Sequence, residues 1–370
     1  MVEGMTMKTK RAASRNNHSH HSSEASLRVA EPKAAETVPK LRSPQDLLQA
    51  VPYLLGYAPA DCLVAVVVRD GYHHVTLGAP LEVVEQPDGP PWVLSRLILD
   101  RDGHPNMDFR VFLVGYGDRE RVLAALRLMR PVLSQQIVDC LIVDRGRWWF
   151  ADKDKLSPGR PLPPTDQLPG GMVRSRVTAL SREDLAASLA APTGEDEDAM
   201  VQALIEALDQ VPEDPIPASR LVLDTIAAWR RGDALSDTEF VAAGVAMAAG
   251  VVREEIWRWL TRDRAIECLP FWKQVLRRTA YGARPIVLAV TGFHAWLAGE
   301  GAVLNICCEE AHASGSQNSL VLLVDKLAQS ALPPTCWEEV LDHLASRVTE
   351  AEASPEMGLV ESQEVHMVPV

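Results

Sequence analysis

The chain has 370 residues, of which 47% are hydrophobic and 24% are charged, and its formal net charge is −13. This composition is typical of globular proteins, and it excludes a wholly disordered chain, a collagen and a pure coiled coil. An acidic surface repels phosphate groups, so it disfavours general nucleic-acid binding. The length is sufficient for two ordinary domains.

The two ends of the chain differ in composition from its middle. Residues 1–40 are rich in Ser, Ala, Lys, Arg and Glu and hold few large apolar side chains, which predicts a disordered, mildly basic tail. Residues 349–370 are acidic and predict a second loose tail. Between these tails we expect an α/β domain over residues 41–193 and a helical domain over residues 194–348.

The compartment is predicted from the cysteines and from the apolar runs. The six cysteines form no CxxC pair, the first residues lack the apolar core of a signal peptide, and the longest apolar runs are shorter than a membrane span. We therefore expect a reduced, cytoplasmic protein with no membrane segment.

Strand and helix patterns alternate in the first predicted domain. Ser43 is a good N-cap before Pro44, and Pro52 is expected to interrupt the helix that starts there. We expect strands over 62–69, 72–84, 109–114, 137–143 and 148–150, helices over 92–99 and 120–133, a further strand over 173–180, and a short helix after Ser181. The fold prediction is a mixed sheet, in which helix-linked strands are parallel and the hairpin after Asp70-Gly71 is antiparallel.

Strand patterns end near residue 193, and only helical patterns follow. We expect helices over 197–210, 219–231, 237–249, 252–262, 271–280, 285–298, 302–313, 319–331 and 336–347. One motif occurs twice, because Ala228-Trp229-x-x-Gly232 resembles Ala295-Trp296-x-x-Gly299. The motif predicts a partly tetratricopeptide-like domain. The alternative is an ordinary helical bundle with similar corners.

Two sets of residues at the ends of predicted strands are candidates for a ligand site. Gly115 and Gly117 lie between a strand and a helix, where nucleotide phosphates bind in Rossmann-like folds. The third glycine of that motif is absent, and Asp118 adds negative charge, so a simple tight turn is the alternative. Asp144 and Arg145 follow another buried strand and could form a polar site with Asp118, or only a surface ion pair.

No complete catalytic or metal-binding motif is present. Cys308 and His312 share one face of a predicted helix, but two ligands do not make a zinc site, so we expect no metal and no cofactor. Trp257, Trp259 and Trp296 are candidates for an interaction surface, because Trp257 and Trp259 cannot both face the same side of a helix, and the alternative is packing in the core and at helix corners.

Four segments of the chain resemble a known family. They are residues 41–64 (LRSPQDLLQAVPYLLGYAPADCLV), Ser181-Arg-Glu-Asp-Leu, Val252-Arg-Glu, and Phe293-His-Ala-Trp-Leu-Ala-Gly-Glu-Gly301. The family is the actinobacterial domain-of-unknown-function family 4192. The resemblance implies an actinobacterial, soluble protein, and it implies no activity, substrate or cofactor.

The first of these segments marks Pro52, Gly56, Pro59, Asp61 and Cys62 as family-motif residues. The resemblance implies that Ser is common at the position of Cys62, and this departure argues against a required hydroxyl nucleophile there. In physical terms the segment is a turn that leads into the first buried strand, because Pro restricts the path and Asp accepts backbone hydrogen bonds. The alternative is a pocket lined by this turn.

These observations leave two main hypotheses for the function, and a purely structural role in an assembly is a third that the sequence does not separate from the first. The first is a non-enzymatic interaction or regulatory module, in which the α/β domain binds a small molecule and the helical domain binds a protein partner. The second is an enzyme that acts on a small molecule at the carboxyl edge of the sheet. The first is motivated by the absence of a complete catalytic motif, and the second by the position of Asp118, Asp144 and Arg145 alone.

Overall fold

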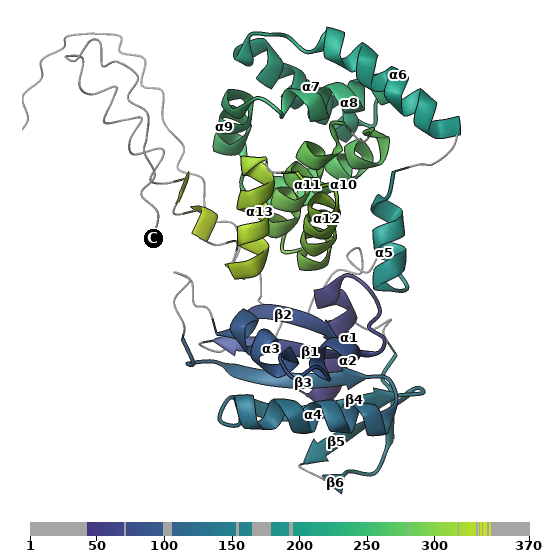
Figure 1. The fold of residues 1–370 in the computed structure, drawn as a ribbon, viewed down its shortest axis with the longest axis vertical. Helices are drawn as coiled ribbons and strands as arrows, with labels where there is room; N and C mark the ends of the chain where they lie inside the picture. Colours follow the sequence, from purple (N-terminus) through teal and green to yellow (C-terminus); the bar gives the residue numbers. More distant parts are fainter. Residues whose placement is uncertain are drawn as a thin grey trace, which may run out of the picture. The chain divides into compact units, whose positions relative to one another are not determined.

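The computed structural model shows a mixed β-sheet followed by a set of packed helices (Figure 1). It describes residues 43–69, 72–98, 106–152, 155–164, 179–191, 195–280, 282–316 and 318–330, together with positions 332, 334, 336–338, 340 and 341. We call residues 43–191 the sheet segment and residues 195–341 the helical segment. The predicted tails, the Asp70-Gly71 turn and most of the predicted strand over 173–180 lie outside the described residues.

The sheet has the spatial strand order β2-β1-β3-β4-β5-β6, and β7 pairs with β5. The strands are β1 (Cys62–Arg69), β2 (Tyr72–Pro80), β3 (Arg110–Tyr116), β4 (Ile137–Asp144), β5 (Arg147–Asp152), β6 (Lys155–Leu156) and β7 (Arg160–Pro161). Among the named strands of the described residues, β3 and β4 alone form a parallel ladder, and the helix α4 connects them. The other ladders are antiparallel, which confirms the predicted mixed sheet.

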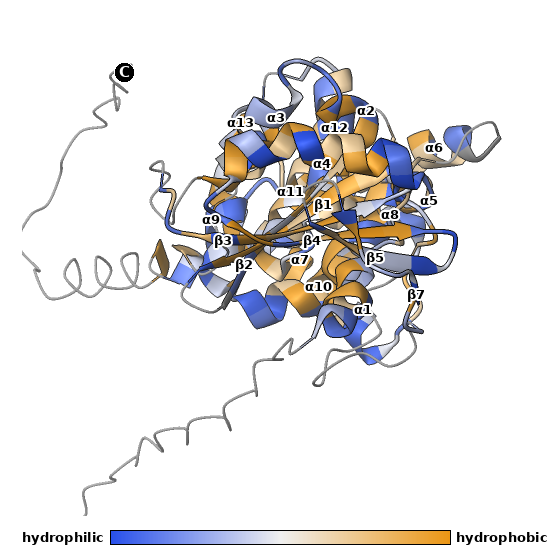
Figure 2. Cartoon of the chain, turned by 90° about the horizontal axis from the view of Figure 1, so that it is seen from below, coloured by the Kyte–Doolittle hydropathy of each residue, from blue (hydrophilic) through white to orange (hydrophobic). Residues whose placement is uncertain are grey.

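The sheet is buried on both faces by two different cores. The helices of this segment are α1 (Pro44–Leu55), α2 (Leu81–Val84), α3 (Gly89–Leu97), α4 (Arg119–Leu133) and α5 (Arg182–Leu189). Successive strand residues point to opposite faces. Leu63 and Val67 therefore pack with the buried residues of α2, α3 and α4, whereas Val64 and Val66 pack with α1. Figure 2 shows the resulting apolar strands beside the half-polar helix α4.

The core beneath α1 continues into the helical segment. One connected set of buried side chains includes Leu48 of α1, Val114 of β3, Leu189 of α5 and Phe293 of the helical segment. The core beneath α4 holds described residues of the sheet segment only. The predicted domain boundary near residue 193 stays a prediction.

The helical segment packs around one central helix. Its helices are α6 (Glu195–Gln210), α7 (Pro215–Arg231), α8 (Asp237–Ala246), α9 (Gly250–Trp259), α10 (Arg262–Arg278), α11 (Arg284–Ala298), α12 (Gly301–Ala313) and α13 (Ser319–Ser330). Nearly every residue of α11 is buried, and this helix contacts α8, α10, α12 and α13 (Figure 1). A helix that is predominantly apolar around its circumference is expected at the centre of a packed domain.

Three polar side chains are buried on α11. Arg284 is 2% exposed and donates hydrogen bonds to the carbonyl oxygens of Leu276 (2.6 Å) and Leu189 (2.9 Å). It also forms an ion pair with Glu310. Thr291 and His294 are likewise buried. Arg284 therefore links α5, α10, α11 and α12.

The repeated Trp-Gly motif forms the same local structure twice. Gly232 ends α7 with φ 83°, and Gly299 ends α11 with φ 79°, a left-handed conformation that favours glycine. In each copy the glycine N–H donates to the carbonyl oxygen of the tryptophan, which is Trp229 or Trp296. The N–H of the residue after the glycine donates to the carbonyl oxygen of the alanine that precedes the tryptophan. The motif is thus a repeated helix C-cap, and the tetratricopeptide-like character stays a prediction.

Two helix boundaries differ from the prediction because proline does not end the helix. Helix α1 continues through Pro52 to Leu55, and α10 starts at Arg262 and continues through Pro270. Proline removes one N–H donor from a helix. The buried neighbours Leu269 and Phe271 around Pro270, and Val51 before Pro52, hold these helices in place by packing.

Other boundaries differ at capping positions. The strand expected over 72–84 ends at Pro80, and α2 begins at Leu81. Helix α7 starts four residues before its predicted position, because Asp214 accepts a hydrogen bond from the Ile216 N–H and Pro215 occupies the first turn.

In the described part of the chain, no helix is both long enough and apolar enough to span a membrane.

Candidate functional site

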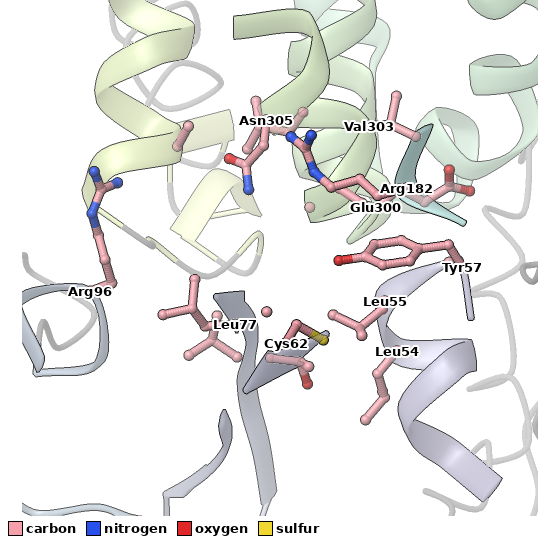
Figure 3. Close-up of a pocket in the computed structure, with 18 of the residues that line it drawn as sticks. Leu54, Leu55, Tyr57, Cys62, Leu77, Arg96, Arg182, Glu300, Val303 and Asn305 are labelled. Atoms are coloured by element: carbon pink, nitrogen blue, oxygen red, sulfur yellow. The ribbon is translucent and has the colours of Figure 1, made fainter. Parts of the chain in front are cut away.

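A cleft of about 1410 Å³ lies between the sheet segment and the helical segment. Its walls come from the α1–β1 connection, the outer strand β2, the start of α5, the turn between α11 and α12, and α13. Figure 3 shows part of the lining: Leu54, Leu55, Tyr57, Cys62, Leu77, Arg96, Arg182, Glu300, Val303 and Asn305. Binding sites for small molecules are concave surfaces of this mixed apolar and polar kind.

The α1–β1 connection forms one wall of the cleft and has a fixed path. Gly56 ends α1 with φ 81°, and its N–H donates to the Pro52 carbonyl oxygen. Asp61 has φ 42°, and its carbonyl oxygen accepts a hydrogen bond from the Leu81 N–H at 2.9 Å. Tyr57 forms a parallel bridge to Ala179. These contacts position the side chains of Tyr57, Asp61 and Cys62 on the cleft wall.

The two groups in this wall that could act as nucleophiles are held in their protonated forms. Burial, together with a smaller contribution from the charge of Asp61, raises the pKa of the Cys62 thiol to about 12. Burial also raises the pKa of the Tyr57 phenol to about 12, with a contribution from Cys62. The thiolate is the nucleophilic form of cysteine, so Cys62 is a poor nucleophile near neutral pH.

Ion pairs stabilise the opposite wall. Arg182 of α5 donates two hydrogen bonds to the Glu309 carboxylate of α12, at 2.6 and 2.8 Å. Lys273 and Glu300 form a second, partly buried pair with an N–O distance of 2.7 Å. The Asp325 carboxylate accepts a hydrogen bond from Gln329 and lies 3.6 Å from His312 Nε2.

Arg96 also lines the cleft, but unlike Arg182 it does not form an ion pair with a described carboxylate. Its guanidinium group lies 5.1 Å from the ring centroid of Trp92, and no carboxylate in the described ranges forms an ion pair with it. In Figure 3 Arg96 points from the sheet side toward the helices, Asn305 points from the helices toward the sheet, and the Tyr57 hydroxyl is directed into the space between them. These three side chains present hydrogen-bonding groups to the same cleft.

The predicted family-motif residues contribute unequally to the cleft. Gly56, Asp61 and Cys62 are part of its lining, whereas Pro52 and Pro59 are not. Pro52 instead lies inside α1, where its carbonyl oxygen accepts the capping hydrogen bond from Gly56.

The predicted carboxyl-edge residues lie outside the lining of the cleft and have structural contacts of their own. A Cβ atom on Gly115 would lie 2.0 Å from Val122 Cγ1, so glycine allows α4 to pack closely on β3. A Cβ atom on Gly117, which has φ 128°, would lie 2.6 Å from Asp61 Oδ1. The turn at Gly117 therefore packs directly against the α1–β1 connection.

The charged residues of the carboxyl edge are in two separate arrangements. The Asp118 side chain is the N-cap of α4 and accepts hydrogen bonds from the N–H groups of Glu120 and Arg121, each at 3.1 Å. Asp144 and Arg145 lie 3.8 Å apart at the β4–β5 turn, where the Arg145 side chain is 89% exposed. The Gly117 N–H donates to the Val143 carbonyl oxygen at 3.1 Å, so the two turns are neighbours, but among the described residues no hydrogen bond or ion pair joins the Asp118 side chain to Asp144 or Arg145.

The three candidate tryptophans are at least partly buried. Trp257 stacks on Phe293 with a centroid distance of 4.6 Å, and Arg264 lies over the ring of Trp259. Trp296 is buried, donates to the Leu332 carbonyl oxygen at 2.8 Å, and lines the cleft. Their role as an interaction surface stays a prediction.

Cys308 and His312 do share a helix face, as their spacing predicts. The His312 Nδ1–H donates to the Cys308 carbonyl oxygen at 3.0 Å, which is a backbone contact. Within the described residues no group of three His, Cys, Asp or Glu side chains could hold a metal ion.

The sequence analysis did not predict four of the cleft residues. It did not single out Arg96, Arg182 or Asn305, and it named motif residues on both sides of Tyr57 but not Tyr57 itself. A signal for two of them was present in the sequence. Tyr57 belongs to the first segment of the family resemblance, and Arg182 belongs to the second. The last segment contributes Trp296, Gly299, Glu300 and Gly301 to the lining, so three of the four segments meet at the cleft.

A comparison with protein families gives a match to the family described as Domain of unknown function (DUF4192), over residues 44–335. The chain belongs to this family. The match covers the sheet and most of the helical segment, so the cleft lies inside the DUF4192 region. The search of curated proteins gave no match, and neither did the search of solved structures.

Proposed function

We propose that this DUF4192 chain is a non-enzymatic binding module that holds a small molecule in the cleft. The observation that supports the proposal is the meeting of three resemblance segments, far apart in the chain, on one concave surface. A molecule bound there would contact residues of both segments, as a regulatory ligand does. The raised pKa values of Cys62 and Tyr57 favour binding over covalent catalysis.

The environment of Arg96 favours a ligand with an acidic group that binds at this side of the cleft. The carboxylates of Glu300, Glu309 and Asp325 are engaged with other protein groups. Arg96 instead stacks on Trp92, which leaves the fork of its N–H donors for a carboxylate or phosphate. Apolar side chains such as Leu77 and Val303 would cover the rest of the molecule.

Native mass spectrometry of the purified full-length chain tests this proposal, followed by a thermal-shift screen of acidic and neutral metabolites. We expect an additional bound mass, or a rise in Tm with acidic compounds. The substitution Arg96→Ala should weaken that binding by about tenfold or more. Arg258→Ala, which removes an exposed arginine outside the cleft lining, is the matched control and should bind as the unmodified chain does. The absence of any bound mass together with no shift in Tm would refute the proposal.

The carboxyl-edge enzyme and the cytoplasmic location remain predictions. No contact in the described structure favours the enzyme, because Asp118 caps a helix and Asp144 pairs with Arg145. The location is supported by the buried thiols of Cys62, Cys140, Cys268, Cys307 and Cys308, which form no disulfide bond.

A further inference from the structure

Helix α6 packs against the rest of the helical segment through a small cluster of its own. Ala203 and Ala207 are buried against Val241 and Ala242 of α8, and this cluster is separate from the two larger cores. Figure 1 shows α6 at the outer edge of the helices. Met200 is also buried and Leu204 packs against the cluster, so one side of α6 is covered, while Val201, Ile205 and Leu208 lie on an exposed side.

An exposed apolar stripe runs along another side of α6. Val201, Ile205 and Leu208 are 45%, 53% and 56% exposed. Their spacing of four and three residues places them on one face of the helix. Three large aliphatic residues in one line are the anchor pattern of a helix that binds in a partner's groove or beside a partner's helix.

The residues around the stripe are acidic. Glu197 and Asp198 precede Val201 by four and three residues, and Asp209 follows Ile205 by four, so all three border the stripe. The sequence of α6 contains no lysine or arginine. A second copy of α6 would therefore bring carboxylates against carboxylates, which opposes self-association through this face.

We propose that the α6 stripe, defined as Val201, Ile205 and Leu208, is a docking surface for a basic amphipathic helix of a protein partner. The aliphatic residues of the partner pack on the stripe, and its flanking lysines or arginines lie near Glu197, Asp198 and Asp209. This surface is distinct from the cleft, because none of its residues line the cleft. Its function is independent of the small-molecule proposal.

Fluorescence anisotropy with two labelled synthetic peptides tests this docking surface on the full-length chain. The first peptide has leucines at positions i, i+4 and i+7 flanked by lysines, and the second has the same composition in scrambled order. We expect the patterned peptide to bind at least about tenfold more tightly, because anchor residues carry most of the binding energy. Moderate salt, near the physiological value, suppresses binding that depends on net charge alone.

Two double variants give a matched comparison. Ile205→Gln with Leu208→Gln removes the stripe and should abolish the preference for the patterned peptide. Leu322→Gln with Leu323→Gln removes two leucines of α13 that are 48% and 42% exposed, and it should leave that preference unchanged. Asp198→Lys with Asp209→Lys retains the stripe and should shift the preference toward a glutamate-flanked peptide.

Three outcomes would overturn the docking proposal. The first is equal binding of both peptides, and the second is unchanged binding by a folded Ile205→Gln/Leu208→Gln variant. The third is that the unmodified chain sediments as a dimer and this variant sediments as a monomer. The last outcome would identify a second copy of the chain as the occupant. If the glutamine variant does not fold, the charge-reversal variant decides the question.

Discussion

The sheet segment and the helical segment bury different kinds of side chain. The side chains classed as buried and polar or charged in the described structure are Ser219, Thr279, Arg284, Thr291 and His294, and all of them lie in the helical segment. The strands instead bury apolar side chains on both faces, apart from groups such as the buried hydroxyl of Tyr116. Backbone hydrogen bonds set the register of a sheet, whereas helices can slide or rotate against each other. Buried polar contacts such as those of Arg284 therefore specify how the helices pack, and steric fit specifies how the sheet packs.

The largest expected effect tests the polar side of this comparison. Arg284→Met removes the bonds to Leu276, Leu189 and Glu310 and leaves a carboxylate and two carbonyl groups without their donor. Removing one partner of a buried ion pair costs about 3 to 5 kcal/mol. Urea unfolding of the full-length chain measures this loss. Arg230→Met, which breaks the exposed pair with Glu267, should cost less than about 1 kcal/mol. Equal losses in the two variants would show that buried polarity does not specify the helical packing.

The next effect is a pH dependence that originates in the helical core. His294 is 1% exposed, and its Nδ1–H donates to the Val290 carbonyl oxygen. Burial lowers the pKa of His294 from 6.5 to about 4. Its neutral form is therefore favoured in the folded state, so its contribution to stability is complete above about pH 6.5 and is lost as the pH falls toward 4.

The corresponding measurement is the free energy of unfolding at about pH 7 and about pH 4.5. The His294 contribution to the decrease should be about 2 to 3 kcal/mol. His294→Leu should remove this part of the pH dependence, while His312→Gln, at a half-exposed position, should leave it in place. If His294→Leu shows the same pH dependence as the unmodified chain, that dependence originates in other titrating groups.

The smallest effect tests the steric side of the comparison. Gly115→Ala places a Cβ atom 2.0 Å from Val122 Cγ1, between β3 and α4. Such overpacking costs about 1 to 3 kcal/mol. Gly292→Ala on α11 should cost less, because the nearest atom is Val324 Cγ1 at 2.9 Å and alanine favours helices.

Chemical denaturation of these variants and of Gly115→Ala/Val122→Ala measures the difference. Val122→Ala should relieve the clash, so the double variant should lose less stability than the sum of the two single variants. Simple additivity would mean that Gly115 is required for a reason other than the approach of α4.

Local signals in the sequence predicted the elements well where they depend on neighbouring residues. Continuous β-branched runs predicted β1, β3 and β4, and Ser43 and Ser181 are N-caps as their positions indicate. The errors occurred where packing outweighs a local rule, as at Pro52 and Pro270 inside helices. The cleft could not be predicted from spacing, because Tyr57, Arg96, Arg182 and Asn305 come from four separate parts of the chain. Only the family resemblance carried a signal for part of it.

The order of the strands also determines the sequence of events during folding. β1 and β2 are separated by only two residues in the chain and pair along their lengths, so they can form a hairpin within microseconds. β3 must then close a loop across α2 and α3 before it pairs with the free edge of β1. This edge exposes unpaired backbone groups of an apolar strand until β3 arrives. We therefore expect a newly synthesised chain to be prone to aggregation in the interval between these two steps, and substitutions that delay α2 or α3 should lower the yield of folded protein without altering the finished structure.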